Sequence, residues 1–364
     1  MRHAAAVRAA ALARGLPPLV ASFGLALIDR ALIDALARAL GLSFSDAMRA
    51  NAFGFAAASI APDLAGFDTA AFLARLSPRA SIAARHTLGL LDPLDGGDLQ
   101  ADAPSDGLPV TLEQVIASYR HDHFKLKLSG HIADDIARLE RIARILDTQV
   151  GRYAATLDGN EQFPDASAIA ELMARMSETP ALAALLRSLL FIEQPIARTE
   201  ALKAPLGELG ARFPVIIDES DAEDGSLNEA LGLGYRGVSS KACKGVWRSL
   251  VNAARLAQRP GGILSGEDLT TQAGLAVQQD LALVSVLGLT HVERNGHHYV
   301  DGFAATPLAE AARFGSAHPD LYHASPGRVR LLIRDGQIAL ATVNGAAGLG
   351  SAVLPDFTAM RPVS

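Results

Sequence analysis

Four short apolar runs, each ending in a charged side chain, constrain what this chain of 364 residues can fold into. They read Tyr153-Ala-Ala-Thr-Leu-Asp158, Leu190-Phe-Ile-Glu193, Pro214-Val-Ile-Ile-Asp218 and Tyr235-Arg-Gly-Val-Ser-Ser-Lys241. Each is too short for a helix and too apolar for an exposed strand, which predicts parallel strands buried on both faces. Helical segments lie between them, so the order predicts βαβ units, and the carboxyl ends of neighbouring strands meet if the sheet closes into a barrel. Carboxylates gathered there are the ligands that a hard divalent cation needs.

The expected fold class is α/β, because a single (β/α) barrel with a smaller attachment fits the length. The expected boundaries are a mostly helical cap over residues 1–80, the barrel over 81–325 and a hairpin over 326–364 that returns to the cap. The hairpin is predicted because the alternating runs 328–334 and 337–343 flank Asp335-Gly336, a strong turn signal.

Composition excludes several classes of partner. The net charge of −6 gives no basic footprint for nucleic acid or for anionic lipid. The apolar segment 16–28 is interrupted by Asp29 and Arg30 well short of a membrane span, so we expect no membrane association. The lone Cys243 cannot form an internal disulfide, which favours the cytoplasm as the location.

A further strand carries two lysines. The run His123-Phe-Lys125-Leu-Lys127 alternates, so both lysines lie on one side, which is the inner side if the strand belongs to the barrel. An edge strand with its lysines in solvent is the alternative. The inward orientation is favoured because the same chain supplies carboxylates that would offset buried ammonium groups.

Taken together, these residues resemble the enolase superfamily, and within it the mandelate racemase and muconate lactonizing enzyme group. The motifs that carry the resemblance are Lys125-Leu-Lys127, Leu157-Asp158-Gly-Asn160, Ile192-Glu193-Gln-Pro195, Ile217-Asp218-Glu219-Ser220 and Ser240-Lys241-Ala-Cys-Lys244-Gly245. The resemblance implies the fuller form of the fold, a modified TIM-type (β/α) barrel with a reduced α+β capping domain built from both termini. It also implies one Mg²⁺, and abstraction of the proton alpha to the carboxylate of a small-molecule substrate to give an enediolate.

The resemblance also assigns roles to residues. It implies Asp158, Glu193 and Asp218 as metal ligands, and Lys127 and Lys241 as acid/bases on opposite faces of the substrate carbon. Lys125 would contact the substrate carboxylate and lower the pKa of Lys127 by like-charge repulsion. The further expected site residues, which contact the ligands, the lysines or the substrate, are Asn160, Glu219, Glu267, Asp268, Glu293 and His297. Lys244, the competitor of Lys241, is expected to be solvated because it lies past the strand end, and His298 shares with His297 the role of a possible general acid.

Several alternatives stay open at this point. Two opposed lysines suit racemisation or epimerisation, cycloisomerisation and syn-elimination equally. An acid-sugar dehydratase that uses His297 or His298 is a second interpretation. A non-catalytic metal-binding relative is a third, because the antiparallel strands and lid loop with which the family begins are not evident here. The edge of the predicted hairpin leaves open a homo-oligomer.

Overall fold

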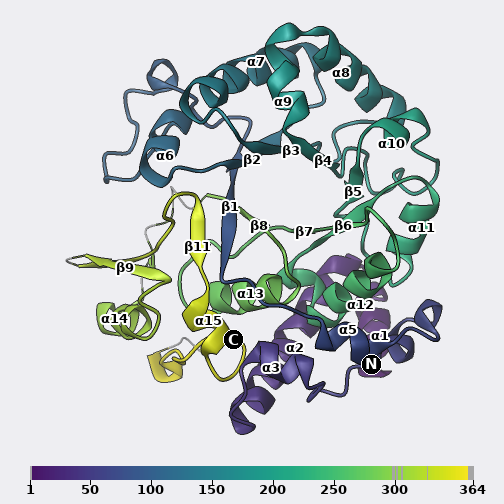
Figure 1. The fold of residues 1–364 in the computed structure, drawn as a ribbon, viewed down its shortest axis with the longest axis vertical. Coiled ribbons are helices and arrows are strands. Elements are labelled where there is room, and N and C mark those ends of the chain that lie inside the picture. The colour runs from purple at the N-terminus through teal and green to yellow at the C-terminus, as the bar shows by residue number, and fades with distance from the viewer. Residues whose placement is uncertain (1, 297–299, 301, 305, 326, 360–364) are drawn as a thin grey trace.

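Eight parallel strands close into a barrel in this computed structural model, which describes residues 2–296, 300, 302–304, 306–325 and 327–359 (Figure 1). The strands are β1 (Ser81–Leu88), β2 (His123–Lys127), β3 (Ala154–Asp158), β4 (Leu189–Glu193), β5 (Val215–Ile217), β6 (Gly237–Ser240), β7 (Ile263–Gly266) and β8 (His291–Arg294). Each pairs with the next along the chain, and β8 returns to β1. The predicted TIM-type barrel is therefore confirmed.

The apolar runs form strands that are covered on both faces, as predicted. Every residue of β5 and β6 is buried, and β3 is buried except for Ala154. Gly237 is the first residue of β6, and a Cβ atom there would lie 1.9 Å from the carbonyl oxygen of Ile263 in the neighbouring strand. Only glycine allows two strands to approach so closely at this point.

Helices surround the barrel (Figure 1). They are α6 (Leu112–Tyr119), α7 (Ile132–Gln149), α8 (Ala166–Glu178), α9 (Ala183–Arg187), α10 (Glu208–Arg212), α11 (Ser226–Gly232), α12 (Val246–Ala257) and α13 (Leu275–Val286). Their starts follow local sequence signals: Thr111 forms a capping box with Gln114 at α6, and Asp165 accepts two backbone hydrogen bonds at α8.

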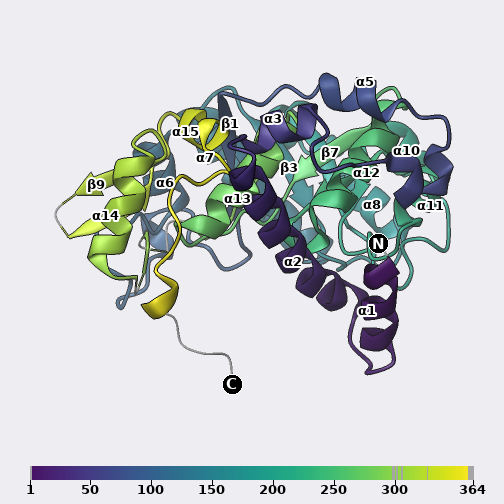
Figure 2. The same cartoon turned by 90° about the horizontal axis from the view of Figure 1, so that it is seen from below.

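The residues before the barrel are helical, as predicted. The helices are α1 (Arg2–Leu12), α2 (Pro18–Ala39), α3 (Phe44–Arg49), α4 (Ala57–Ile60) and α5 (Thr69–Ala74). The long helix α2 runs along the outside of the molecule (Figure 2) and packs against the turn η4 (Ala242–Lys244), which follows β6. In the described part of the chain, no helix is both long enough and apolar enough to cross a membrane.

The hairpin predicted near the carboxyl terminus forms only at its turn, where Arg334 pairs antiparallel with Gln337. The two runs do not pair along their length: β10 (Arg328–Leu331) pairs with β9 (Tyr322–Ser325), whereas β11 (Gln337–Ala339) pairs antiparallel with β1. The turn at Asp335-Gly336 forms, but the strand after it, β11, pairs with β1 instead of with β10. This occurs because β2 pairs with β1 only from His86 onward, which leaves the start of β1 with an open edge. The elements α14 (Leu308–Ala317) and α15 (Ala341–Gly345) complete this region.

Candidate functional site

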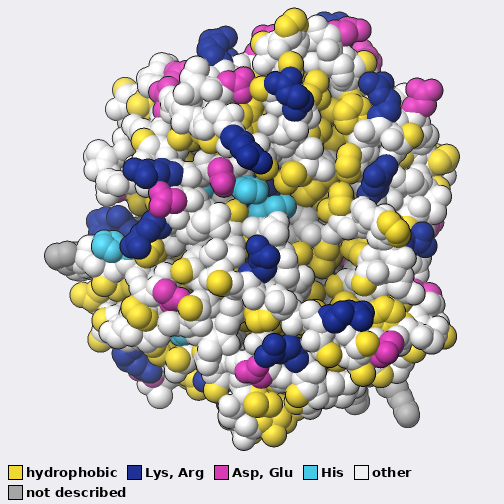
Figure 3. All heavy atoms as spheres, viewed as in Figure 1, with side chains coloured by type: hydrophobic (Ala, Val, Ile, Leu, Met, Phe, Trp, Pro, Cys, Tyr) yellow, Lys and Arg dark blue, Asp and Glu magenta, His cyan; other side chains and the backbone are white. Residues whose placement is uncertain are grey.

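The predicted site residues meet at the carboxyl ends of the barrel strands. Lys127, Asp158 and Glu193 are the last residues of β2, β3 and β4, while Asp218, Lys241 and Glu267 directly follow β5, β6 and β7. The opposite mouth faces the viewer in Figure 3, where histidine side chains gather near its centre. His123 and His291, which begin β2 and β8, lie at that end with ring centroids 5.3 Å apart.

Lys125 lies at the centre of a buried charge cluster. Its Nζ is 2.9 Å from Asp158, 2.8 Å from Glu193, 3.0 Å from Glu267 and 3.2 Å from Glu293. Burial lowers the pKa of Lys125, but these carboxylates outweigh the effect and raise it well above its ordinary value. The sequence predicted an inward Lys125 correctly. Its ammonium group is engaged by protein carboxylates in this structure.

Arg85 is the cation that sequence reasoning missed. It lies in β1, is fully buried and forms an ion pair with Glu267, and its Nη1 donates a hydrogen bond to Ser265 at 3.1 Å. In the sequence, Arg85 and His86 interrupt the apolar run that forms β1. The signal that could have identified Arg85 is its spacing: it stands two residues before Thr87, which donates to Glu293 at 2.8 Å inside the barrel.

Lys127 and Lys241 stand on opposite sides of the barrel mouth, because β2 and β6 are four strands apart in a barrel of eight. Lys127 Nζ lies 2.6 Å from Asp158, and Lys241 contacts Asp218 and, at 2.6 Å, Asp268. Their side chains are 20% and 12% exposed, in contrast to 2% for Lys125, so these two lysines can reach a bound molecule. Burial lowers the pKa of Lys241, but attraction by Asp218 and Asp268 raises it above its ordinary value.

Lys244 contradicts the expectation of a solvated lysine. Its side chain is 1% exposed, and Nζ donates to the carbonyl oxygen of Asp218 at 2.8 Å and to Ser239 Oγ at 2.7 Å. The turn η4 is followed by Gly245, whose φ of 95° directs the chain back into α12, which packs against α2. Burial raises the pKa of Asp218, but Lys244 and Lys241 outweigh it and lower the value.

The remaining predicted acids divide into buried and exposed groups. Glu293 is buried and accepts a hydrogen bond from the backbone N–H of Asp268 at 2.9 Å, while Lys125 and Lys127 lower its pKa despite burial. Glu267 is also buried. Asp268 has a half-exposed side chain and a left-handed φ of 50°, which turns its carboxylate towards Lys241.

Two further predicted residues border the cluster. Asn160 also adopts a left-handed φ, 43°, and its backbone N–H donates to Asp158 at 2.9 Å. Burial and the neighbouring Asp218 raise the pKa of Glu219 to about 7. His297 and His298 lie outside the described residues.

The chemistry of Asp158, Glu193 and Asp218 fits a hard cation, because all three offer carboxylate oxygens. Glu193 Oε2 accepts no hydrogen bond from the described residues, although Lys125 Nζ lies 2.8 Å away. Burial and the charge of Asp158 raise the pKa of Glu193 well above its ordinary value. The ammonium group of Lys125 lowers this pKa but does not offset the two larger effects. In the described ranges, however, no three His, Cys, Asp or Glu side chains share a position for a metal ion. Ammonium groups lie among the acids instead, and the ligand roles stay predictions.

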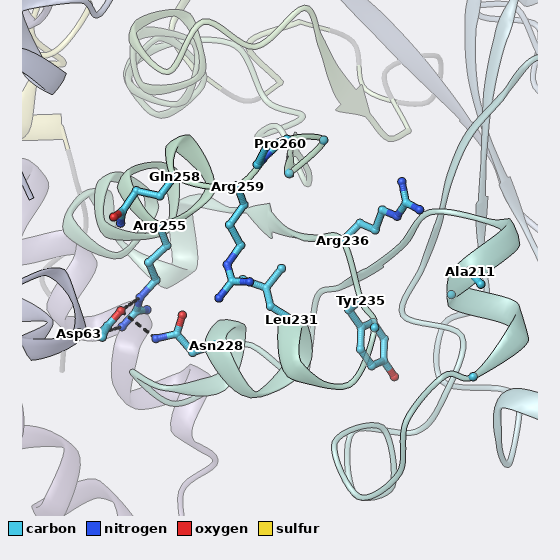
Figure 4. A pocket seen from close by; sticks show the side chains of 15 residues that line it. Asp63, Ala211, Asn228, Leu231, Tyr235, Arg236, Arg255, Gln258, Arg259 and Pro260 are labelled. Atoms are coloured by element: carbon cyan, nitrogen blue, oxygen red, sulfur yellow. Dashed lines mark hydrogen bonds and ion pairs between the residues drawn. The ribbon is translucent and has the colours of Figure 1, made fainter.

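A separate hollow of about 920 Å³ lies near the amino-terminal ends of β6 and β7 (Figure 4). It is lined by Tyr235, Arg236 and Arg259 among others. Asp63 binds Arg255 at its edge through contacts of 2.8 and 2.9 Å. This hollow is at the opposite end of the strands from the acids, so it is distinct from the candidate site.

Comparison with known proteins gives a likeness to solved structures. No family model and no curated protein matches the sequence. A mandelate racemase/muconate lactonizing enzyme from Roseiflexus sp. is 20% identical with a TM-score of 0.55, over 90% of this chain and 72% of that one. A muconate lactonizing enzyme from Klebsiella pneumoniae is 20% identical with a TM-score of 0.53, over 89% and 70%. A mandelate racemase/muconate lactonizing protein from Herpetosiphon aurantiacus is 17% identical with a TM-score of 0.50, over 76% and 65%.

The chain therefore spans about two thirds to three quarters of the length of these proteins. At such identities the likeness concerns the fold. The resemblance predicted from the motifs is confirmed at this level: the chain has the fold of the mandelate racemase and muconate lactonizing group of the enolase superfamily.

Proposed function

We propose that this chain is a Mg²⁺-dependent enzyme of the lyase or isomerase type that removes the proton alpha to the carboxylate of a small-molecule substrate. The observation that carries the proposal is the pair of partly exposed lysines, Lys127 and Lys241, on opposite sides of a mouth lined by three carboxylate strand ends. Racemisation or epimerisation, cycloisomerisation and syn-elimination all use such a pair. The neighbouring structures with the same fold support this reaction class.

The charge balance of the site supports a divalent cation bound together with an anionic substrate. Seven carboxylates form ion pairs with six cationic side chains, an excess of one negative charge. The acids are Asp158, Glu193, Asp218, Asp221, Glu267, Asp268 and Glu293, and the cations are Arg85, Lys125, Lys127, Lys241, Lys244 and Arg248. A buried cluster is stable only near neutrality. A divalent cation together with one substrate carboxylate would remove the excess.

Different residues of the chain would have different roles in the proposed reaction. Mg²⁺ bound by Asp158, Glu193 and Asp218 would act as a Lewis acid that stabilises the negative charge developing on the substrate carboxylate. Lys127 and Lys241 would take the alpha proton from one face of the substrate carbon and return a proton to the other. Asp218 and Asp268 hold Lys241 in its charged form, which suits it to donate the proton. Lys125 and Arg85 would keep the surrounding carboxylates in place.

Exchange of the alpha proton in deuterium oxide tests the proposal. With Mg²⁺ and a panel of enantiomeric carboxylic acids, NMR would show exchange that Lys127→Ala removes for one enantiomer and Lys241→Ala for the other. Lys203→Ala, at a 66% exposed lysine on the surface, is the matched control and leaves both rates unchanged. Full exchange in the Lys127→Ala/Lys241→Ala double variant, or no exchange of any acid by the wild type, would contradict the proposal.

A further inference from the structure

The outward face of α2 consists entirely of apolar residues, glycine and alanine. From position 20 to position 40 the exposed residues are Val20, Phe23, Gly24, Leu27, Ile28, Ala31, Leu32, Ala35, Leu36, Ala39 and Leu40. More than half of the surface of Ile28 and Leu32 is accessible to solvent: Ile28 is 61% exposed and Leu32 is 64% exposed. A surface helix ordinarily turns its apolar face to the core and its charges to water. On α2 this orientation is reversed.

The charged residues of α2 all point towards the body of the protein. Arg30 is buried and pairs with Asp280 of α13 at 2.9 Å. Arg38 pairs with Asp34 at 2.7 Å, and both also hold the segment near Ser351 through hydrogen bonds of 2.6 and 2.7 Å. Asp29 is half-buried, and burial raises its pKa. The orientation of the helix is therefore fixed by specific ion pairs, and its apolar face stays outward.

The size of this face matches what a stable dimer needs. Burying one large aliphatic side chain removes on the order of 100 Å² of apolar surface, so each half-exposed one leaves about 50 Å². The large apolar side chains of α2 and its flanks, Leu16, Val20, Phe23, Leu27, Ile28, Leu32, Leu36 and Leu40, are 42–64% exposed. Together they offer on the order of 400 Å² of apolar surface. A standard interface of about 800 Å² per partner that is about 60% apolar contains about 480 Å² of apolar surface, so the apolar area of this face is close to that of a standard interface.

We propose that two copies of this chain associate through α2, with the two helices antiparallel about a two-fold axis near Ile28. Since the face carries no charge, it meets its own copy without repulsion, and Gly24, Ala31 and Ala35 allow the two helices to approach. A membrane surface fits less well. Membrane-bound helices present lysine and arginine on the polar face, whereas both arginines of α2 are neutralised by aspartates.

The proposal stands independently of the catalytic one, but it has a consequence for the candidate site. The inner face of α2 packs on η4, which holds Lys244, and Ala26 Cβ would lie 3.6 Å from a Cβ atom at Gly245. A second copy that immobilises α2 would therefore support the turn between Lys241 and α12. The predicted hairpin, whose edge first raised the idea of an oligomer, is paired only at Arg334 and Gln337, and β11 is covered by β1 instead.

Sedimentation at micromolar concentration tests the proposal. The wild type sediments as a dimer, and Ile28→Glu/Leu32→Glu, which places charges on the outward face, weakens association by at least about 100-fold. The matched control is Leu91→Glu/Leu308→Glu, at positions 95% and 54% exposed elsewhere on the surface, which stays dimeric. Circular dichroism shows that each variant keeps its helices. A monomeric wild type, or a dimer that survives the α2 double variant, overturns the proposal; a monomer that co-sediments with phosphatidylserine vesicles overturns it in favour of a membrane.

A cysteine scan checks the geometry. In an antiparallel pair, Ile28→Cys lies near its own copy and forms an intermolecular disulfide on mild oxidation, whereas Leu40→Cys lies far from its own copy and does not. The parent protein, with only Cys243, is the control. Efficient cross-linking at position 40 with none at position 28 would exclude the antiparallel arrangement.

Discussion

Replacing Lys125 by methionine removes the ammonium group on which the buried acids depend. Four carboxylates lie within 3.2 Å of Lys125 Nζ, and the side chain is 2% exposed. Hydrogen bonds to charged groups contribute about 1.5–3 kcal/mol each, but the acids repel one another and partly regain protons, so their losses do not add. Removing one partner of a buried ion pair typically costs about 3–5 kcal/mol. We expect Lys125→Met to lower the free energy of unfolding by this amount.

Urea unfolding followed by the fluorescence of Trp247 measures the effect, because this sole tryptophan stacks on Phe55 at 5.9 Å between the amino-terminal helices and α12. Lys203→Met, on the surface, is the control and changes stability by less than about 0.5 kcal/mol. Adding Glu267→Gln to Lys125→Met removes one unpaired charge and recovers part of the loss. A cost below about 1 kcal/mol for Lys125→Met, or purely additive costs in the double variant, would refute the reasoning.

Three further predictions follow from the site and the fold. Mg²⁺ at about 100 times its Kd raises the free energy of unfolding of the wild type by about 2.7 kcal/mol, and Glu193→Gln abolishes the effect in thermal denaturation; an equal shift in the variant would contradict a role of Glu193 as ligand. Arg255 lowers the pKa of Asp63 from 3.8 to about 2 (Figure 4), so this carboxylate stabilises the fold above about pH 4 and loses its contribution as the pH falls towards 2. Because Asp63 is 36% exposed, urea unfolding of Asp63→Asn shows a loss of no more than about 1 kcal/mol at neutral pH, and none near pH 2. Gly237→Ala forces a Cβ atom to 1.9 Å from a carbonyl oxygen and costs more than about 3 kcal/mol, whereas Gly225→Ala, with no atom within 4 Å of its Cβ position, stays within about 0.5 kcal/mol in the same assay.

The sequence predicted those features that depend on a short segment alone. Apolar runs that end in acid defined the strands and the carboxylates at their ends, because a parallel barrel buries both faces of each strand. The predictions that failed concern features that depend on a strand or residue far away in the sequence. The turn at Asp335-Gly336 forms as predicted, yet β11 pairs along its length with β1 and with the preceding run only at Arg334. Lys244 is buried because η4 turns its side chain back to Asp218. Nothing in the local sequence specifies either partner.

Two parts of the molecule reverse the ordinary distribution of apolar and charged residues, and both reversals are informative. Inside the barrel, Arg85 and Lys125 occupy positions where an apolar side chain would be expected, and each is held by carboxylates from other strands. On α2, the apolar residues face outward because Arg30 and Arg38 are fixed inward by ion pairs. A sequence agrees with its fold at most positions, and departures are expected where function imposes another requirement. We propose that in the barrel this requirement is a charged site for an anionic substrate, and that on α2 it is association with a second copy of the chain.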